Sequence, residues 1–206
     1  MRPVVMFSLV PVALAIAASL PAQNTVNAVN GVEPGIELSK TRGLALGLHL
    51  DASSIAPSDG TAERGFGGGA RLGYGISDKV ILFAEVDAAS LGYADGPGSY
   101  TLAHVGLGAR ASLGVTQAKL RPYFEGALVG VGVADDVEGS SVVLSGAALQ
   151  GGMGLEYFVS RRLAVDGGLQ VGPGSLSRAT VDGDEVDFDS LNFTSVRFNL
   201  GFVFHP

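Results

Sequence analysis

The last fifteen residues, 192–206, constrain the fold more than any other stretch of the chain. Side chains of a β-strand point alternately to its two faces. One face of this stretch would carry Thr194, Val196, Phe198, Leu200, Phe202 and Phe204, and the other Ser195, Arg197, Asn199 and Gly201. The pattern therefore predicts a strand with one strongly apolar face and one polar face.

The apolar face of this strand needs an apolar partner. No long helical pattern occurs elsewhere in the chain to cover it. Lipid is the remaining apolar environment, and a closed barrel can span lipid because its strands satisfy one another's backbone groups. The stretch therefore indicates a transmembrane barrel strand, with its apolar face toward lipid and its polar face toward the interior.

Seven further segments show the same alternation, and eight strands are therefore expected. They are residues 42–51, 65–75, 80–90, 100–113, 121–133, 142–157 and 163–171. In the fifth strand, 121–133, the register could slip by one residue, which would exchange its two faces. Long loops (52–64, 91–99, 134–141 and 172–189) alternate with short turns (76–79, 116–120 and 159–162). This order is typical of an up-and-down barrel. The expected fold is all-β, an eight-stranded antiparallel up-and-down transmembrane β-barrel over residues 42–206.

The N-terminal residues have the pattern of an export signal. An apolar run, 4–20, follows Arg2 and precedes Pro21 and Ala22. This predicts a signal peptide over 1–22, cleaved after Ala22, and a periplasmic lead-in over 23–41. The alternative is an uncleaved anchor helix, which Pro11 and the short length of the run disfavour.

Composition and charge exclude several classes of protein. The chain has no cysteine, which excludes disulfides and thiolate chemistry. Its 31 glycines suit the tightly curved wall of a small barrel. The net charge is −7, and eleven acidic residues fall in the four predicted long loops. An acidic chain without clustered Lys or Arg is a poor nucleic-acid binder.

The pattern as a whole resembles the small eight-stranded outer-membrane barrels of the OmpA transmembrane-domain and OmpX type, over nearly the whole mature chain. This resemblance implies a monomer in the bacterial outer membrane, in contact with lipid and lipopolysaccharide. It also implies folding by the barrel-assembly machinery, which recognises an aromatic terminal strand. The residues of that assembly signal would be Phe198, Leu200, Phe202 and Phe204.

Charged side chains are expected inside the barrel, where an isolated ion would be strongly destabilising. We predict that they form interior ion pairs that plug the lumen. The residues are Arg71, Glu85, Asp87, Arg110, Glu125, Glu156, Asp166 and Arg197. Two alternatives remain open: a conducting pathway through the interior, and a soluble lipocalin-like barrel that would turn these charges outward.

The functional expectation is a structural or surface-interaction protein. The alternatives are a small-solute channel and, in third place, a lipid A-modifying enzyme. Such an enzyme would need a histidine close to a serine nucleophile. No serine is suitably placed near His49, His104 or His205, so neither catalysis nor a cofactor is expected.

The acidic stretch 182–189 carries five carboxylates in eight residues. Hard divalent cations with oxygen ligands relieve such repulsion. Asp182, Asp184 and Asp187 are therefore candidate ligands for calcium or magnesium, and Asp135, Asp136 and Glu138 could add to them. The alternative is a solvated loop that keeps the surface anionic.

Overall fold

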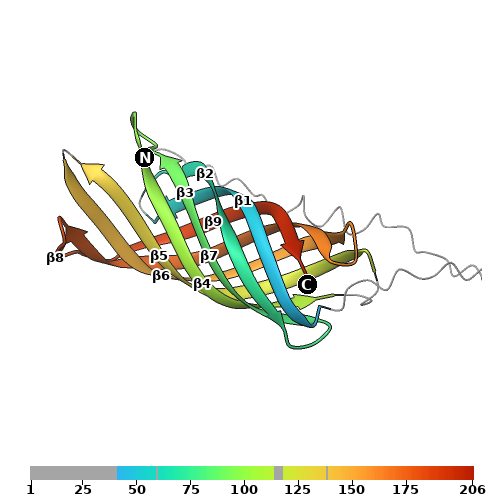
Figure 1. Cartoon of the computed structure of the whole chain (residues 1–206). Coiled ribbons are helices and arrows are strands. Elements are labelled where there is room, and N and C mark those ends of the chain that lie inside the picture. Colours follow the sequence, from blue (N-terminus) through green and yellow to red (C-terminus); the bar gives the residue numbers. More distant parts are fainter. Residues whose placement is uncertain (1–40, 59, 114–117, 138) are drawn as a thin grey trace, which may run out of the picture. The chain divides into compact units, whose positions relative to one another are not determined.

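The computed structural model describes residues 41–58, 60–113, 118–137 and 139–206. These residues form strands joined by short connections (Figure 1). The strands are β1 (Gly43–Pro57), β2 (Glu63–Gly75), β3 (Val80–Gly92), β4 (Ser99–Ser112), β5 (Leu120–Val137), β6 (Ser140–Phe158), β7 (Leu163–Val181), β8 (Asp184–Val186) and β9 (Leu191–Phe204). None of the described residues forms a helix long and apolar enough to cross a membrane. The predicted signal peptide, and all of the predicted lead-in except Thr41, lie outside the described residues.

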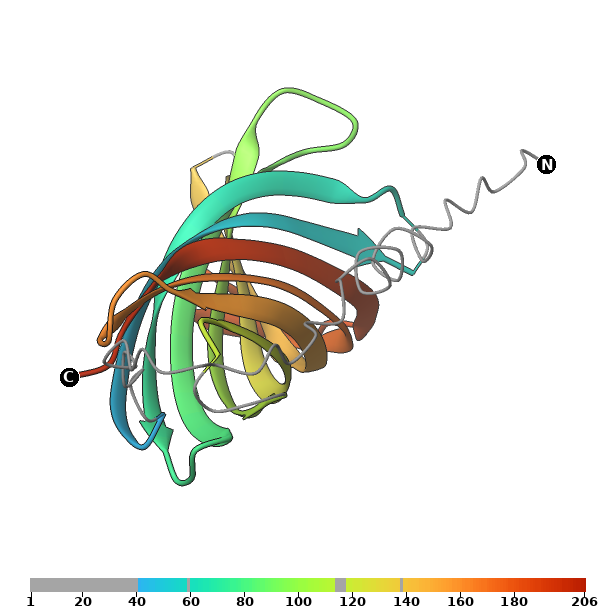
Figure 2. The same cartoon turned by 90° about the vertical axis from the view of Figure 1, so that its right-hand side faces the viewer.

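Eight of the strands close into a barrel, as the sequence predicted. Neighbouring strands are antiparallel in the order β6, β5, β4, β3, β2, β1, β9, β7, and pairing of β6 with β7 completes the ring. The short strand β8 lies outside this ring and pairs with the last three residues of β7. Figure 2 shows the strands curving around a common axis. The register of β5 is the unslipped one, because Glu125 is buried and lies opposite Arg110 of β4.

The outer surface of the barrel is apolar and the interior polar over most of its height. The outward leucines of β1, from Leu44 to Leu50, are 43% to 74% exposed, whereas Asp51 is buried. On β9, Phe198 and Phe202 face out and Arg197 faces in. The structure therefore has the orientation of a barrel in lipid, and the lipocalin-like orientation is wrong.

At one end, which we call the turn end, short connections at 76–79 and 159–162 lie beside the C-terminus. At the other, the projecting end, the tips of β5, β6 and β7 extend beyond the rest of the wall (Figure 1). The sequence predicted loops at 52–64, 134–141 and 172–189. This is wrong for much of their length, because β1 continues to Pro57, β5 to Val137 and β7 to Val181.

The reason for this error is that the two faces of the wall exchange their polarity near the projecting end: the inward residues become apolar and the outward residues polar. On β3, Glu85 and Asp87 face the interior, but farther along the strand the inward residues are Ala89 and Leu91. These and their neighbours form an apolar group that we call the mouth cluster: Ile55, Ala89, Leu91, Tyr100, Leu102, Val129, Val131, Ala148, Leu176 and Phe193. Where the interior is apolar and the outer face of the wall is exposed to water, the outward residues are polar. Small polar residues in a sequence are also typical of a loop, so the sequence predicted loops here.

Candidate functional site

The charged residues of the interior meet in one connected group. Arg71 on β2 lies opposite Glu85 on β3, and its Nε donates to Glu85 Oε2 at 2.6 Å. Its Nη1 reaches across the lumen to Glu125 Oε2 on β5, at 2.8 Å. One guanidinium therefore joins two sides of the barrel.

Arg110 on β4 extends this group toward β7. Its Nε donates to Glu125 Oε2 at 3.0 Å and its Nη1 to Asp166 Oδ2 at 2.7 Å. The guanidinium carbon lies 3.6 Å from the centroid of the Tyr123 ring, and the Tyr123 hydroxyl donates to Asp166 Oδ1 at 3.1 Å. Arg110 thus has its charge neutralised and one face of its guanidinium covered by an aromatic ring.

Arg197 on β9 closes the group from the opposite side. It donates to Glu85 and Asp87 on β3, and its Nε donates to Gln170 Oε1 at 3.0 Å. The second oxygen of Asp87 lies 2.7 Å from His104 Nδ1. Seven of the eight predicted interior residues therefore belong to one hydrogen-bonded array, which we call the central network: Arg71, Glu85, Asp87, Arg110, Glu125, Asp166 and Arg197.

The eighth predicted residue, Glu156, lies in a separate group at the turn end. Its Oε1 is 3.0 Å from Nε2 of His205, whose ring centroid lies 5.5 Å from that of Phe158. The guanidinium carbon of Arg121 is 4.4 Å from the same Phe158 ring centroid. Arg121 begins the predicted fifth strand but was not among the predicted interior residues, and the structure buries it. His205 gave no sequence signal, because its partner is 49 residues away.

The interior leaves little room beside these side chains. Two voids that adjoin the central network have volumes of about 20 and 10 Å³. A void needs roughly 10 to 15 Å³ of such volume to hold one water molecule. Toward the projecting end, the mouth cluster fills the interior with apolar side chains that are almost fully buried. Side chains therefore occupy the described part of the lumen at two successive levels.

Above the mouth cluster lies a shallow cavity of about 190 Å³, open at the projecting end. The hydroxyl of Tyr100 donates to Glu63 Oε2 at 2.5 Å, and that of Tyr93 donates to the Asp135 carboxylate. The hydrogen bond to Asp135 raises the pKa of Tyr93 above its ordinary value. Each of these two carboxylates thus accepts a hydrogen bond from a tyrosine.

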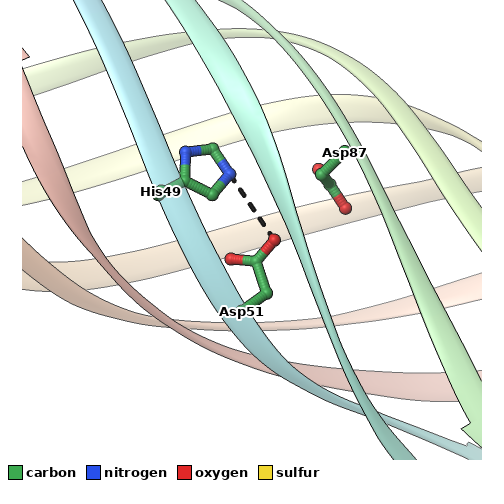
Figure 3. Close-up of side chains that lie close together, drawn as sticks. All are labelled: His49, Asp51 and Asp87. Carbon is green, nitrogen blue, oxygen red and sulfur yellow. Dashed lines mark ion pairs between the residues drawn. The ribbon is translucent and has the colours of Figure 1, made fainter.

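The three predicted metal ligands of the acidic stretch lie around β8. Asp182 is in the turn after β7, and its Oδ1 accepts a hydrogen bond from the Ser141 amide at 2.9 Å. Asp184 opens β8, and Asp187 follows it. The described residues instead bring together a different group, His49, Asp51 and Asp87, whose ligand atoms all lie within 4.8 Å of one another (Figure 3).

The residues of the predicted assembly signal lie on the outer face of β9. Phe198, Leu200, Phe202 and Phe204 are 42% to 58% exposed. Their strand pairs with β1 on one side and β7 on the other, so it closes the barrel. Recognition of this strand by the assembly machinery stays a prediction.

Comparisons with known proteins agree with this architecture. Neisserial surface protein A is 18% identical, with a TM-score of 0.64 over 79% of this chain and 96% of that one. OprG from Pseudomonas aeruginosa is 15% identical, with a TM-score of 0.51 over 82% and 98%. Ail of Yersinia pestis, solved with the heparin analogue sucrose octasulfate, is 11% identical, with a TM-score of 0.50 over 79% and 99%.

At these identities the likeness shows the fold alone. No sequence among the curated proteins matches the chain. The family described as outer membrane protein beta-barrel domain matches residues 10–204, which is nearly the whole chain. The chain therefore belongs to the outer membrane protein beta-barrel domain family and is a β-barrel protein of the bacterial outer membrane.

Proposed function

We propose that this barrel is a closed surface protein that presents an acidic rim to partners outside the cell, and that it is not a solute channel. The observation that carries the proposal is the double closure of the interior. The central network fills the lumen at mid-height, and the mouth cluster fills it again toward the projecting end. An eight-stranded interior is narrow enough for side chains to fill it.

The chemistry of the projecting end supports a role at the surface. Nine acidic residues lie there in the described chain, against Arg64 and Arg178. The acids are Glu63, Asp95, Asp135, Asp136, Asp182, Asp184, Glu185, Asp187 and Asp189. Like charges of this density attract cations and repel anions. The expected partners are therefore cationic: a basic protein segment, or divalent cations that bridge to lipopolysaccharide phosphates.

This charge also separates the chain from one of its structural neighbours. Ail has been crystallised with sucrose octasulfate, a polyanion. Carboxylates at the rim of this barrel would repel a ligand of that kind.

The described histidines also support a role without catalysis. His104 contacts Asp87, His205 contacts Glu156 and His49 lies beside Asp51, and the remaining ring nitrogens of His104 and His205 are not hydrogen-bonded to any serine among the described residues.

The closed interior predicts the electrical behaviour of the purified barrel. Reconstituted into a planar lipid bilayer, it should show no large, stable single-channel conductance. A double variant, Leu102→Ala with Arg197→Ala, removes one side chain from each level of closure and is the matched comparison. Steady openings by the unmodified protein would contradict the proposal and favour the channel alternative.

The acidic rim predicts weak capture of calcium. Calorimetry on the refolded barrel should show binding at millimolar calcium, because carboxylates without a compensating cation repel one another. The heat should disappear when Asp182, Asp184 and Asp187 are all replaced by Asn. No heat at millimolar calcium, or the same heat in the triple variant, would leave the solvated loop as the correct interpretation.

A further inference from the structure

Three potential metal ligands converge inside the barrel, beside the central network. His49 and Asp51 lie on β1 and Asp87 lies on β3, with β2 between them (Figure 3). His49 Nε2 is 3.5 Å from Asp51 Oδ2, and the ligand atoms of all three residues lie within 4.8 Å of one another. Two carboxylates and one imidazole thus face the same small volume.

A glycine on the intervening strand makes this meeting possible. Gly69 lies opposite both His49 and Asp87 in the sheet. A Cβ at this position would lie 2.7 Å from His49 Nε2 and 2.5 Å from the Cβ of Asp87. Any side chain on β2 here would therefore fill the space in which the groups from β1 and β3 come together.

Both oxygens of Asp87 are hydrogen-bonded, but other polar atoms that face this space have no hydrogen-bond partner among the described residues. Asp51 is 3% exposed, yet neither of its carboxylate oxygens is hydrogen-bonded, and the same holds for Nε2 of His49. Asn199, which pairs with Asp51 across the seam between β1 and β9, has an unpartnered Oδ1. Buried polar groups are nearly always hydrogen-bonded, so a buried carboxylate that has only the His49 ring 3.5 Å away as an ion-pair partner, and no hydrogen bond among the described residues, points to a missing ligand.

The charge balance of the interior indicates the sign of that ligand. Six carboxylates lie inside the described barrel: Asp51, Glu85, Asp87, Glu125, Glu156 and Asp166. In the same part of the chain four guanidiniums face them, those of Arg71, Arg110, Arg121 and Arg197, and three imidazoles, those of His49, His104 and His205, each lie against one carboxylate. With the imidazoles neutral, as a metal-binding imidazole must be, two negative charges are left over, and neither oxygen of Asp51 is hydrogen-bonded to an arginine. A ligand shared by a neutral His49 and Asp51 is therefore a cation.

We propose that His49, Asp51 and Asp87 bind one divalent cation of intermediate hardness, with Zn²⁺ as the best fit. An imidazole nitrogen with carboxylate oxygens is a donor set that zinc accepts, whereas calcium and magnesium prefer oxygen alone. Zinc holds such ligands at about 2.0 to 2.2 Å in tetrahedral geometry, so two ligand atoms of one ion lie roughly 3.3 to 3.6 Å apart. The 3.5 Å between His49 Nε2 and Asp51 Oδ2 falls in this range, and the ligand atom of Asp87 lies within 4.8 Å of both.

The surroundings of Asp87 support it in this role. His104 Nδ1 and Arg197 both contact its carboxylate, which holds the group in place. Metal-binding carboxylates commonly have such supporting hydrogen bonds. A cation here would join β1 to β3 over β2, next to the strand pair β1 and β9 that closes the barrel. Its role would be structural, and it does not depend on the proposed function of the rim.

The test is zinc binding by the refolded full barrel, stripped of metal with a chelator. Elemental analysis should find one zinc per chain, and competition with a chromophoric chelator gives the affinity. His49→Gln and Asp51→Asn should each weaken binding by at least about 100-fold, since removal of a supporting group alone costs about 10- to 100-fold. Mobility on an unboiled gel shows that each variant has folded.

Two control variants distinguish this site from zinc bound elsewhere on the barrel. Asp182→Asn, in the acidic loop, and His205→Gln, at the turn end, should leave zinc affinity unchanged. X-ray absorption of the zinc-loaded barrel should show one imidazole nitrogen among oxygen ligands, and His49→Gln should remove that signal. The proposal is overturned if the native barrel retains no stoichiometric zinc, or if His49→Gln and Asp51→Asn bind it as the native barrel does.

Discussion

Replacing Arg197 by Met should destabilise the barrel by about 3 to 5 kcal/mol, the usual cost of removing one partner from a buried ion pair. Arg197 is 2% exposed and contacts Glu85, Asp87 and Gln170. Without its charge, Asp87 is left with His104 as its partner, and Glu85 with Arg71. The cost arises mainly from the charge that is left uncompensated, because methionine preserves much of the volume of the arginine stem.

The measurement is urea unfolding from lipid vesicles, followed by the gel mobility of the folded form, because the chain contains no tryptophan. Arg178→Met is the control, since Arg178 is exposed near the tip of β7 and should cost less than about 0.5 kcal/mol. Adding Asp87→Asn to Arg197→Met should restore part of the stability, because it removes a charge that has lost its partner. If Arg197→Met unfolds within about 1 kcal/mol of the native barrel, roughly the range of an exposed pair, the central network is not a buried ion-pair array.

Replacing Leu48 by Arg should cost about 2 to 4 kcal/mol, the penalty for a cation at the mid-membrane face of a barrel. Leu48 is 69% exposed on the outer wall, between Ala70 of β2 and Phe202 of β9. Arginine there would face hydrocarbon with no anionic partner. Unfolding of the same kind, carried out in vesicles, measures the difference.

Thr101→Arg is the matched control for this substitution. Thr101 is also exposed on the outer wall, but it lies on β4 beside the mouth cluster, where the outward face is polar. Arginine should be tolerated at this position, with a change below about 0.5 kcal/mol. An equal penalty at both positions would contradict the proposal that the lipid-facing band ends where the outward residues change from apolar to polar.

The strand pattern determined the class of fold, the number of strands in the barrel and, in the lipid-facing band, the direction of each face. These properties depend on the identity of residues two apart in the chain, so they can be predicted without knowledge of distant contacts. Leu46, Glu85 and Phe198 all face as their alternation predicts. The inward position of Arg71, Arg110 and Arg197 follows from the same local rule.

Tertiary structure decided which interior groups meet. Arg197 and Asp87 are 110 residues apart and become partners only because the ring closes and the strands are staggered. His49, Asp51 and Asp87 converge because Gly69 leaves space between two strands, which no local pattern reveals. The mouth cluster could not be predicted for a related reason. Leu91 and Phe193 belong to segments in which the apolar residues face inward, and each segment is too short to be recognised within one strand. Closure of the barrel brings these short segments together into one apolar layer, which can be recognised only in the folded structure.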